Sequence, residues 1–416
     1  MTSAVTPSLE TAGDTVAGLL AEIADLGRDP VRGGYSRPVH GPAETELREW
    51  FVSHAERRRL EVHTDRNGIV WAWAPAHDGS RDRAVVTGSH LDSVPGGGAY
   101  DGPLGVASAL VAFDQLAARG VGANRARAIA VFPEEEGSRF GVACLGSRLL
   151  TGAIAPDRAL ALKDADGLTF AEVARDAGLA PEGFGPDPDL LGSLDTFLEL
   201  HVEQGRGLVD LGQPVAVASS ILGHGRWRVS LTGEGNHAGT TLMGDRRDPM
   251  VAAARLVVRL RDLARAVPDA RATVGRLIPV PGGTNVIASH VDLWVDVRHP
   301  DDGVTAGLVR EVREAAGLLA AEEGCAATMT EESLSSTVDF DAGLRDELLS
   351  VLPNAPVLGT GAGHDAGVLG SQVRTGMLFV RNPTGVSHSP EEAVEDGDAE
   401  AGAAALADSL ELLLRA

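Results

Sequence analysis

Histidine and carboxylate side chains occur in this sequence at points where apolar runs end. His90 and Asp101 are separated by a loop with three glycines, at 96–98, that could fold one donor back toward the other. Asp92, two residues after His90, could orient the imidazole through a hydrogen bond. A nitrogen and an oxygen donor placed in this way suit a divalent metal, and a tight turn with polar surface side chains would explain them equally well.

Three further segments offer donors of the same kind. Three successive glutamates, 134–136, follow a second apolar run, where unpaired carboxylates are costly. His201 lies inside a third apolar run, and His388 follows a fourth. Taken singly, these are an acidic loop and two lone histidines. Taken together, nitrogen and oxygen donors at four predicted strand ends suit Zn²⁺, Mn²⁺ or Co²⁺ in an open catalytic site, where a neighbouring carboxylate can carry a proton.

A separate polar group lies between residues 218 and 333. It contains His237, Asn285 and Arg298, each at or near the end of a predicted strand. Arg298 could bind a carboxylate through two hydrogen bonds. The simpler alternative for Arg298 is a surface ion pair with Asp296 or Asp301.

Composition excludes several classes of protein. The chain has 416 residues and a formal net charge of −23, so nucleic acid and anionic membrane surfaces are expected to be poor partners. Its two cysteines, Cys144 and Cys325, are too few for a disulfide framework or a zinc ribbon. We find neither a secretory signal nor an apolar stretch of membrane-spanning length, and we expect a cytoplasmic protein.

The elements that must position these side chains alternate between strand and helix. Apolar runs predict strands at 69–74, 83–87, 126–132, 197–202 and 376–380, and helical spacing predicts helices at 14–27, 44–60, 104–119 and 399–414. An acidic cap at Asp14 and a stop at Gly27 are expected for the first helix. The acidic run 391–398 is interpreted as a solvated helix entry. This order is typical of an α/β fold with a mostly parallel sheet covered on both faces.

The pattern changes between residues 218 and 333. Strands at 227–231, 273–279 and 291–297 and helices at 249–266 and 305–321 predict a β-α-β-β-α-β order, which is ferredoxin-like. We therefore expect an inserted α+β domain at 218–333. The larger domain would be formed by residues 1–217 and 334–416.

Eight motifs in this chain resemble those of the M20 metallopeptidase-type amidohydrolases. The similarity is to the group of N-carbamoyl-L-amino acid hydrolases, β-ureidopropionases and allantoate amidohydrolases. The motifs run in the family's order from residue 88 to 392: GSHLDSVPGGGAYDG, EEEGSRF, LELHVEQG, GNHAGTT, NVI, VDVRHPD, GAGHDA and GVSHSPEE. Gly235 stands where the family commonly has Ala, and Leu242 where it commonly has Pro, which concerns the shape of the substrate site.

The resemblance implies a zinc-peptidase-type catalytic domain with two divalent ions per subunit, Zn²⁺ or Mn²⁺, Co²⁺ or Ni²⁺. Asp101 would bridge them, and the other ligands would be His90, His201, Glu136 and His388. Glu135 would be the general base, with Asp92 supporting the site. His237 would donate to the oxyanion. The substrate carboxylate would be held by Gln204, Asn285 and Arg298. The inserted domain would serve as lid and homodimer contact, and His237, Asn285 and Arg298 could reach the partner's site.

The expected reaction is hydrolysis of a linear carbamoyl or ureido amide on a small carboxylate, allantoate or an N-carbamoyl-L-amino acid. Three alternatives stay open. The first is an N-formyl- or N-formimino-amino acid hydrolase, for example of N-formylglutamate. The second is a dipeptidase or acetylamino-acid deacylase. The third is an inactive, metal-stabilised scaffold dimer, which would require a missing base or ligand.

Overall fold

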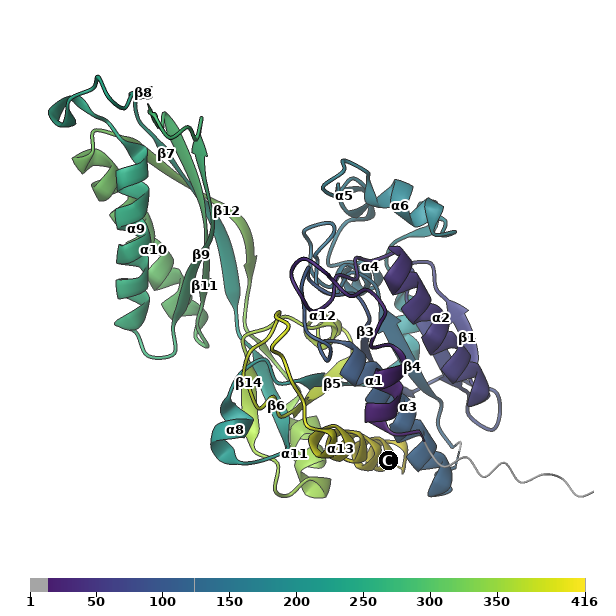
Figure 1. Cartoon of the computed structure of the whole chain (residues 1–416). Helices are drawn as coiled ribbons and strands as arrows, with labels where there is room; N and C mark the ends of the chain where they lie inside the picture. The colour runs from purple at the N-terminus through teal and green to yellow at the C-terminus, as the bar shows by residue number, and fades with distance from the viewer. Residues whose placement is uncertain (1–13, 123, 416) are drawn as a thin grey trace, which may run out of the picture. The chain divides into compact units, whose positions relative to one another are not determined.

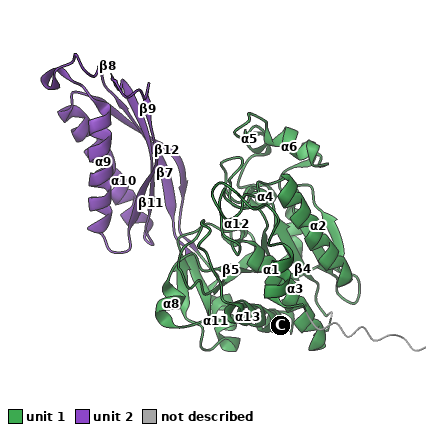
Figure 2. Cartoon of the chain, viewed as in Figure 1, with its two compact units in different colours: residues 1–220, 339–416 green, residues 221–338 purple. Residues whose placement is uncertain are grey.

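The computed structural model of the chain describes residues 14–122 and 124–415. It consists of two compact units (Figure 2). The larger unit contains the chain up to Ser220 and again from Asp339, and the inserted unit is Ile221–Val338. The sequence predicts this insertion at 218–333. The chain thus leaves the larger unit once, forms the second unit, and returns.

The apolar runs form a nine-stranded mixed sheet in the larger unit (Figure 1). Its path is β1-β2-β4-β3-β5-β15-β6-β13, with β14 paired to β6. The central pairs β4–β3, β3–β5 and β5–β15 are parallel, whereas β1, β2 and β6 join antiparallel. The strands are β1 (Glu61–Thr64), β2 (Val70–Ala74), β3 (Ala84–His90), β4 (Arg127–Phe132), β5 (Leu194–Val202), β6 (Val215–Ile221), β13 (Val338–Asp339), β14 (Val357–Thr360) and β15 (Arg374–Val380).

Helices cover this sheet. The central helix α3 packs on β3 and β5 and against α13, and twelve of its residues are buried. The helices of the larger unit are α1 (Val16–Glu22), α2 (Pro42–Arg57), α3 (Pro103–Ala118), α4 (Leu145–Thr151), α5 (Pro156–Leu160), α6 (Phe170–Asp176), α7 (Pro188–Ser193), α8 (Gly207–Leu211), α11 (Ala342–Val351), α12 (Asp365–Leu369) and α13 (Asp396–Arg415), with a 3₁₀ turn η1 (Pro181–Gly183). The prediction of an α/β unit around a large sheet is confirmed, and the sheet is mixed, with its parallel pairs at the centre and antiparallel pairs on both sides.

Two details of the sequence-based prediction are wrong. The first helix is capped by Thr15, whose side chain accepts from the Gly18 N–H at 3.0 Å, while Asp14 pairs with Arg58. This helix ends at Glu22, well before Gly27. The acidic run 391–398 is only partly solvated, because Glu392 and Asp398 are each 5 % exposed. Both carboxylates have internal hydrogen-bond donors, so their burial is compensated.

The inserted unit is an antiparallel sheet with two helices. Its strand order is β12-β7-β11-β9. Its strands are β7 (His224–Thr232), β9 (Arg271–Val280), β11 (His290–Arg298) and β12 (Ala326–Ser335), and its helices are α9 (Pro249–Arg265) and α10 (Asp302–Glu322). Burial alternates along β11, as expected of a sheet covered on one face. This β-α-β-β-α-β arrangement has the ferredoxin-like topology.

A separate two-stranded sheet lies next to one end of this sheet in the chain. The short strands β8 (Asn236–His237) and β10 (Val286–Ile287) pair with each other. In the chain, β8 follows the end of β7 and β10 precedes the start of β11, where Thr232 pairs with His290. A 3₁₀ turn, η2 (Met243–Asp245), follows β8. In the described part of the chain, no helix is long and apolar enough to cross a membrane.

Candidate functional site

The carboxyl ends of β3 and β5 bring two histidines to one carboxylate. His90 is the last residue of β3, and His201 lies near the end of β5. Asp101, in the loop before α3, points its Oδ1 at both rings, 3.4 Å from His90 Nε2 and 3.2 Å from His201 Nε2. All three side chains are buried. This first donor group has the composition of a metal site.

The second oxygen of Asp101 belongs to another donor group. Asp101 Oδ2 lies 3.4 Å from His388 Nε2, which is in turn 3.2 Å from Glu136 Oε2. Within each of the two groups, the possible ligand atoms lie within 4.8 Å of one another. The second group is the more open one, because the His388 side chain is 49 % exposed. Asp101 therefore belongs to both donor groups.

The charges at these groups fit a cation. In the ion pairs of the described residues, the partners of Asp92, Asp101, Glu135 and Glu136 are histidines. Burial lowers the pKa of His90, but the Glu135 and Asp101 carboxylates outweigh burial and raise that pKa well above its usual range. Protons on the histidines thus balance these carboxylates, and divalent ions would displace such protons on binding.

Backbone carbonyls orient the two buried imidazoles. His90 Nδ1 donates to the Asp92 carbonyl at 3.0 Å, and His201 Nδ1 donates to the Val202 carbonyl at 3.0 Å. The Nε2 atoms therefore face Asp101, to which they donate while the rings are protonated, and loss of those protons would leave the Nε2 lone pairs free to bind a metal. Asp92 was predicted to orient His90, and it does so through its main chain, since its carboxylate Oδ1 is 3.6 Å from Nδ1.

The carboxylate of Asp92 holds the glutamate loop instead. Its Oδ1 accepts from the Glu135 N–H and its Oδ2 from the Glu136 N–H, both at 3.2 Å. The Cys144 N–H donates to the Glu135 carbonyl at 2.7 Å from the other side. One buried acid and the start of α4 therefore fix the backbone of the two glutamates.

Glu135 lies beside the first donor group and outside both sets of metal-type ligands. Its Oε2 is 3.6 Å from His90 Nε2, and its Oε1 is 3.6 Å from Cys144 Sγ. The side chain is 5 % exposed, and burial raises its pKa well above the usual range. A carboxyl group in this position suits proton transfer.

Gln204 joins the two donor groups. Its Nε2 donates to Asp101 Oδ2 at 2.8 Å and to Ser387 Oγ at 3.1 Å. Its Oε1 is buried and has no hydrogen-bond partner. That oxygen is a free acceptor next to the cluster.

The sequence did not single out His364, which lies at the same site. The ring is 3 % exposed, its centroid is 4.4 Å from that of His201, and its Nδ1 is 3.9 Å from Glu135 Oε1. Neither ring nitrogen has a hydrogen-bond partner. His364 follows a glycine loop after β14 in the GAGHDA motif, and that position was the available signal.

His237 and Asn285 lie together in the inserted unit. His237 pairs with Val286 across β8 and β10, and the Ala238 N–H donates to the Asn285 carbonyl at 3.0 Å. Both side chains are exposed. His237 Nδ1 accepts from the Gly239 N–H at 3.1 Å, so a neutral ring carries its proton on Nε2 and offers it as a donor.

Arg298 is at the opposite end of the same sheet. It closes β11 opposite His224, whereas His290, at the start of β11, is next to the β8–β10 end. Eight residue steps of about 3.4 Å separate the two ends, which is about 27 Å. The structure therefore does not bring Arg298 together with Asn285 or His237 within one copy. Arg298 pairs with Asp296 through its Nε at 2.7 Å and Nη2 at 2.9 Å.

Comparison with known proteins gave consistent matches. Residues 86–412 match the model of peptidase family M20/M25/M40. The chain is 33 % identical to an N-carbamoyl-L-amino acid amidohydrolase of Geobacillus stearothermophilus over 93 % of this chain and 95 % of that protein. It is 31 % identical to an allantoate amidohydrolase of Escherichia coli over 92 % and 94 % of the two chains. A crystal structure of a hydantoinase/carbamoylase family amidase from Burkholderia vietnamiensis superposes with a TM-score of 0.86 at 30 % identity, over 98 % and 99 %.

Proposed function

Because the chain belongs to peptidase family M20/M25/M40, we propose that it hydrolyses a linear carbamoyl or ureido amide on a small carboxylate, an N-carbamoyl-L-amino acid or allantoate. The identification of the family from its sequence motifs is confirmed. One observation carries the proposal: Asp101 is shared by two donor groups, and the buried Glu135 lies beside them. An inactive scaffold would not need that base.

Two divalent ions would be held by residues of the larger unit alone. The ligands would be His90, Asp101 and His201 for one ion, and Asp101, Glu136 and His388 for the other. When bound, such a pair polarises the scissile carbonyl and makes water a nucleophile near neutral pH. Nitrogen and oxygen donors without sulfur suit Zn²⁺, Mn²⁺, Co²⁺ or Ni²⁺.

Glu135 would move the proton. Its carboxylate would accept a proton from the attacking water and deliver it to the leaving nitrogen. Burial raises the pKa of Glu135, and dications a few ångströms away would lower that pKa again. The Asp92 carboxylate and the Cys144 N–H would keep this base at a constant distance from His90 during the cycle.

The remaining polar residues would bind the substrate. Gln204 Oε1 has no partner in the structure and can accept from an amide N–H of the substrate. His237 presents an Nε2–H that can donate to a developing oxyanion. Arg298 and Asn285 would contact the substrate carboxylate, and Arg298 supplies a local positive charge in an acidic protein.

The separation of about 27 Å within the inserted unit sets a condition on these roles. A small carboxylate spans only a fraction of that distance. Arg298 and the His237–Asn285 pair must therefore come from different copies if both act on one substrate molecule. We infer that the active form is a homodimer whose sites combine residues of both subunits.

Complementation between two inactive variants tests this dimer. His237→Ala and Arg298→Ala are each expected to be nearly inactive alone. In a mixed dimer, one of the two sites would regain both intact residues, and activity per heterodimer should return to about half the wild-type value. If the mixed sample stays as inactive as the parents although heterodimers form, both residues act from the same copy and the inference is wrong.

A substrate panel on enzyme reconstituted with metal tests the reaction. The panel contains allantoate together with N-carbamoyl, N-formyl and N-acetyl amino acids and dipeptides. We expect the highest kcat/KM on a carbamoyl or ureido substrate. A higher kcat/KM on the formyl compounds, or no turnover of any carbamoyl or ureido acid with two ions bound, would overturn the proposal.

A further inference from the structure

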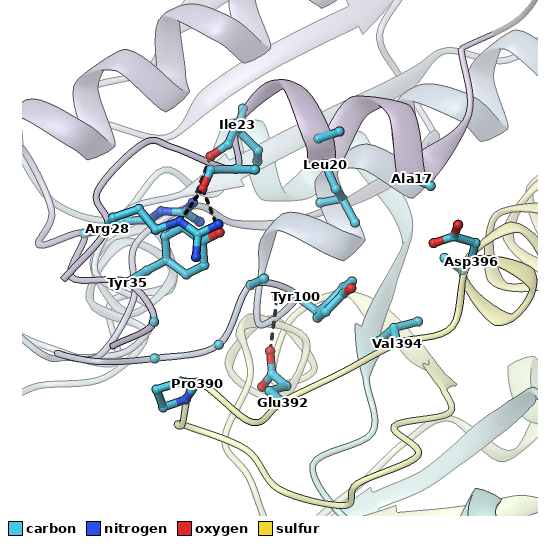
Figure 3. Close-up of a pocket in the computed structure, with 18 residues that line it drawn as sticks. Ala17, Leu20, Ile23, Arg28, Tyr35, Tyr100, Pro390, Glu392, Val394 and Asp396 are labelled. Carbon is cyan, nitrogen blue, oxygen red and sulfur yellow. Dashed lines mark hydrogen bonds between the residues drawn. The ribbon is translucent and has the colours of Figure 1, made fainter. Parts of the chain in front are cut away.

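Glu392 is a buried carboxylate that contacts the segments carrying Asp101 and His388 without belonging to either donor group. It follows His388 by four residues and is 5 % exposed. Its Oε1 accepts from the main-chain N–H groups of Tyr100 and Asp101, both at 3.0 Å. Figure 3 shows the bond to Tyr100, with the Glu392 side chain directed at the loop before α3. This carboxylate thus holds the backbone of the shared ligand itself.

The second oxygen of Glu392 reaches the loop of the exposed ligand. Its Oε2 accepts from Ser387 Oγ at 3.1 Å, and Ser387 immediately precedes His388. Ser387 Oγ also lies 3.3 Å from Asp101 Oδ2. One carboxylate therefore links the segments that carry Asp101 and His388, which are far apart in the sequence.

The glycine-rich loop is shaped around this carboxylate. A Cβ atom built on Gly98 would lie 2.2 Å from Glu392 Oε1, which is well inside contact distance. Only glycine lets the loop approach so closely. On its other side Glu392 borders a cavity of about 430 Å³, lined also by Tyr35 and Tyr100 (Figure 3).

We propose that Glu392 is a positioning residue that keeps Asp101 and His388 at the separation a second ion requires. The inference rests on the proposed two-metal function. The first donor group depends less on Glu392, because His90 and His201 are buried in strands of the central sheet. His388 lies in a loop and is half exposed, so its position depends on such links. Loss of Glu392 should therefore weaken one ion more than the other.

Titration of metal-free protein with Zn²⁺ or Co²⁺ tests this without any turnover. Wild type should bind two ions. Glu392→Ala should bind one ion only slightly more weakly than wild type and the other about 10- to 100-fold more weakly, the range for residues that support metal ligands. Glu392→Gln should recover part of the affinity, because its Oε1 can still accept from both N–H groups. Glu391→Gln is the matched control, since Glu391 is exposed and bonds to Ser389; it should bind like wild type.

Two results would overturn the role of Glu392. One is a Glu392→Ala protein that binds both ions within twofold of wild type. The other is equal weakening of both ions with a lower unfolding temperature of the metal-free protein, which would indicate general damage. If Glu392→Ala does not fold, Ser387→Ala removes the same link with little change in volume and should also weaken a single ion; unchanged affinities would count against the proposal. A wild type that binds fewer than two ions would refute the proposed function instead.

Discussion

The strongest single test of the site geometry is the substitution Asp92→Asn. The Asp92 carboxylate is fully buried and accepts from the N–H groups of Glu135 and Glu136, one on each oxygen. Asparagine has the same shape but only one acceptor oxygen. One of the two N–H groups would then face an amide NH₂ group, and a buried donor would lose its partner.

The expected magnitude follows from that lost partner. An unsatisfied buried donor costs about 1–3 kcal/mol. Both donors belong to the loop that carries Glu135 and Glu136. We therefore expect the lost free energy to displace the general base Glu135 and the metal ligand Glu136, and so to lower activity. At about 1.4 kcal/mol per factor of ten, kcat/KM should fall by about 5- to 150-fold.

The assay is kcat/KM of enzyme saturated with metal, with metal affinity and unfolding temperature measured on the same samples. Asp78→Asn is the control, because Asp78 is exposed and its Oδ1 accepts from the Ser80 N–H in a turn. That variant should keep wild-type kinetics. If Asp92→Asn retains kcat/KM within twofold and binds both ions normally, the Asp92 carboxylate does not position the loop.

Three further predictions follow from individual side chains. Glu135→Gln should keep both ions and lose activity by orders of magnitude, and surviving kcat would exclude Glu135 as the base. Arg298→Ala should raise KM on a carboxylate substrate so far that the variant is nearly inactive at substrate concentrations that saturate wild type, and unchanged KM would remove its assigned role. Burial lowers the pKa of His40 to about 3, below the unfolded value of about 6.5, so stability present above pH 6.5 is lost as the pH falls. From pH 7 to 5 the free energy of unfolding should fall by about 2 kcal/mol on account of His40. His40→Asn tests this, because asparagine tolerates the positive φ at this position. In urea unfolding, the free energy of unfolding of this variant should fall by about 2 kcal/mol less than that of wild type over the same pH range.

The sequence by itself determined the donors and the strands that carry them. His90 follows one apolar run and His201 lies within another, and such runs favour buried central strands. The carboxyl ends of parallel neighbours meet at one edge of a sheet, so the donors converge. The alternating pattern between residues 218 and 333 likewise predicts the inserted sheet, because burial on one face requires period two.

The tertiary structure decided which way the loop side chains point. Glu392 belongs to an acidic run that has the composition of a solvated segment. Its side chain nevertheless points into the protein, where the N–H groups of Tyr100 and Asp101 and the Ser387 hydroxyl donate hydrogen bonds to it. His364 follows a glycine loop that has no strand or helix periodicity, and it reaches the site through the path of β14 and α12. Loops lack the periodicity that reveals burial in strands and helices.

Distances between motifs also required the structure. His237, Asn285 and Arg298 form one group in the sequence, but the antiparallel register of β7 and β11 places them at opposite ends of one sheet. Register is set by strand pairing and packing across the whole unit. The residue types therefore specify the chemistry, while the pairing of strands decides which of those residues a single copy can bring to one substrate.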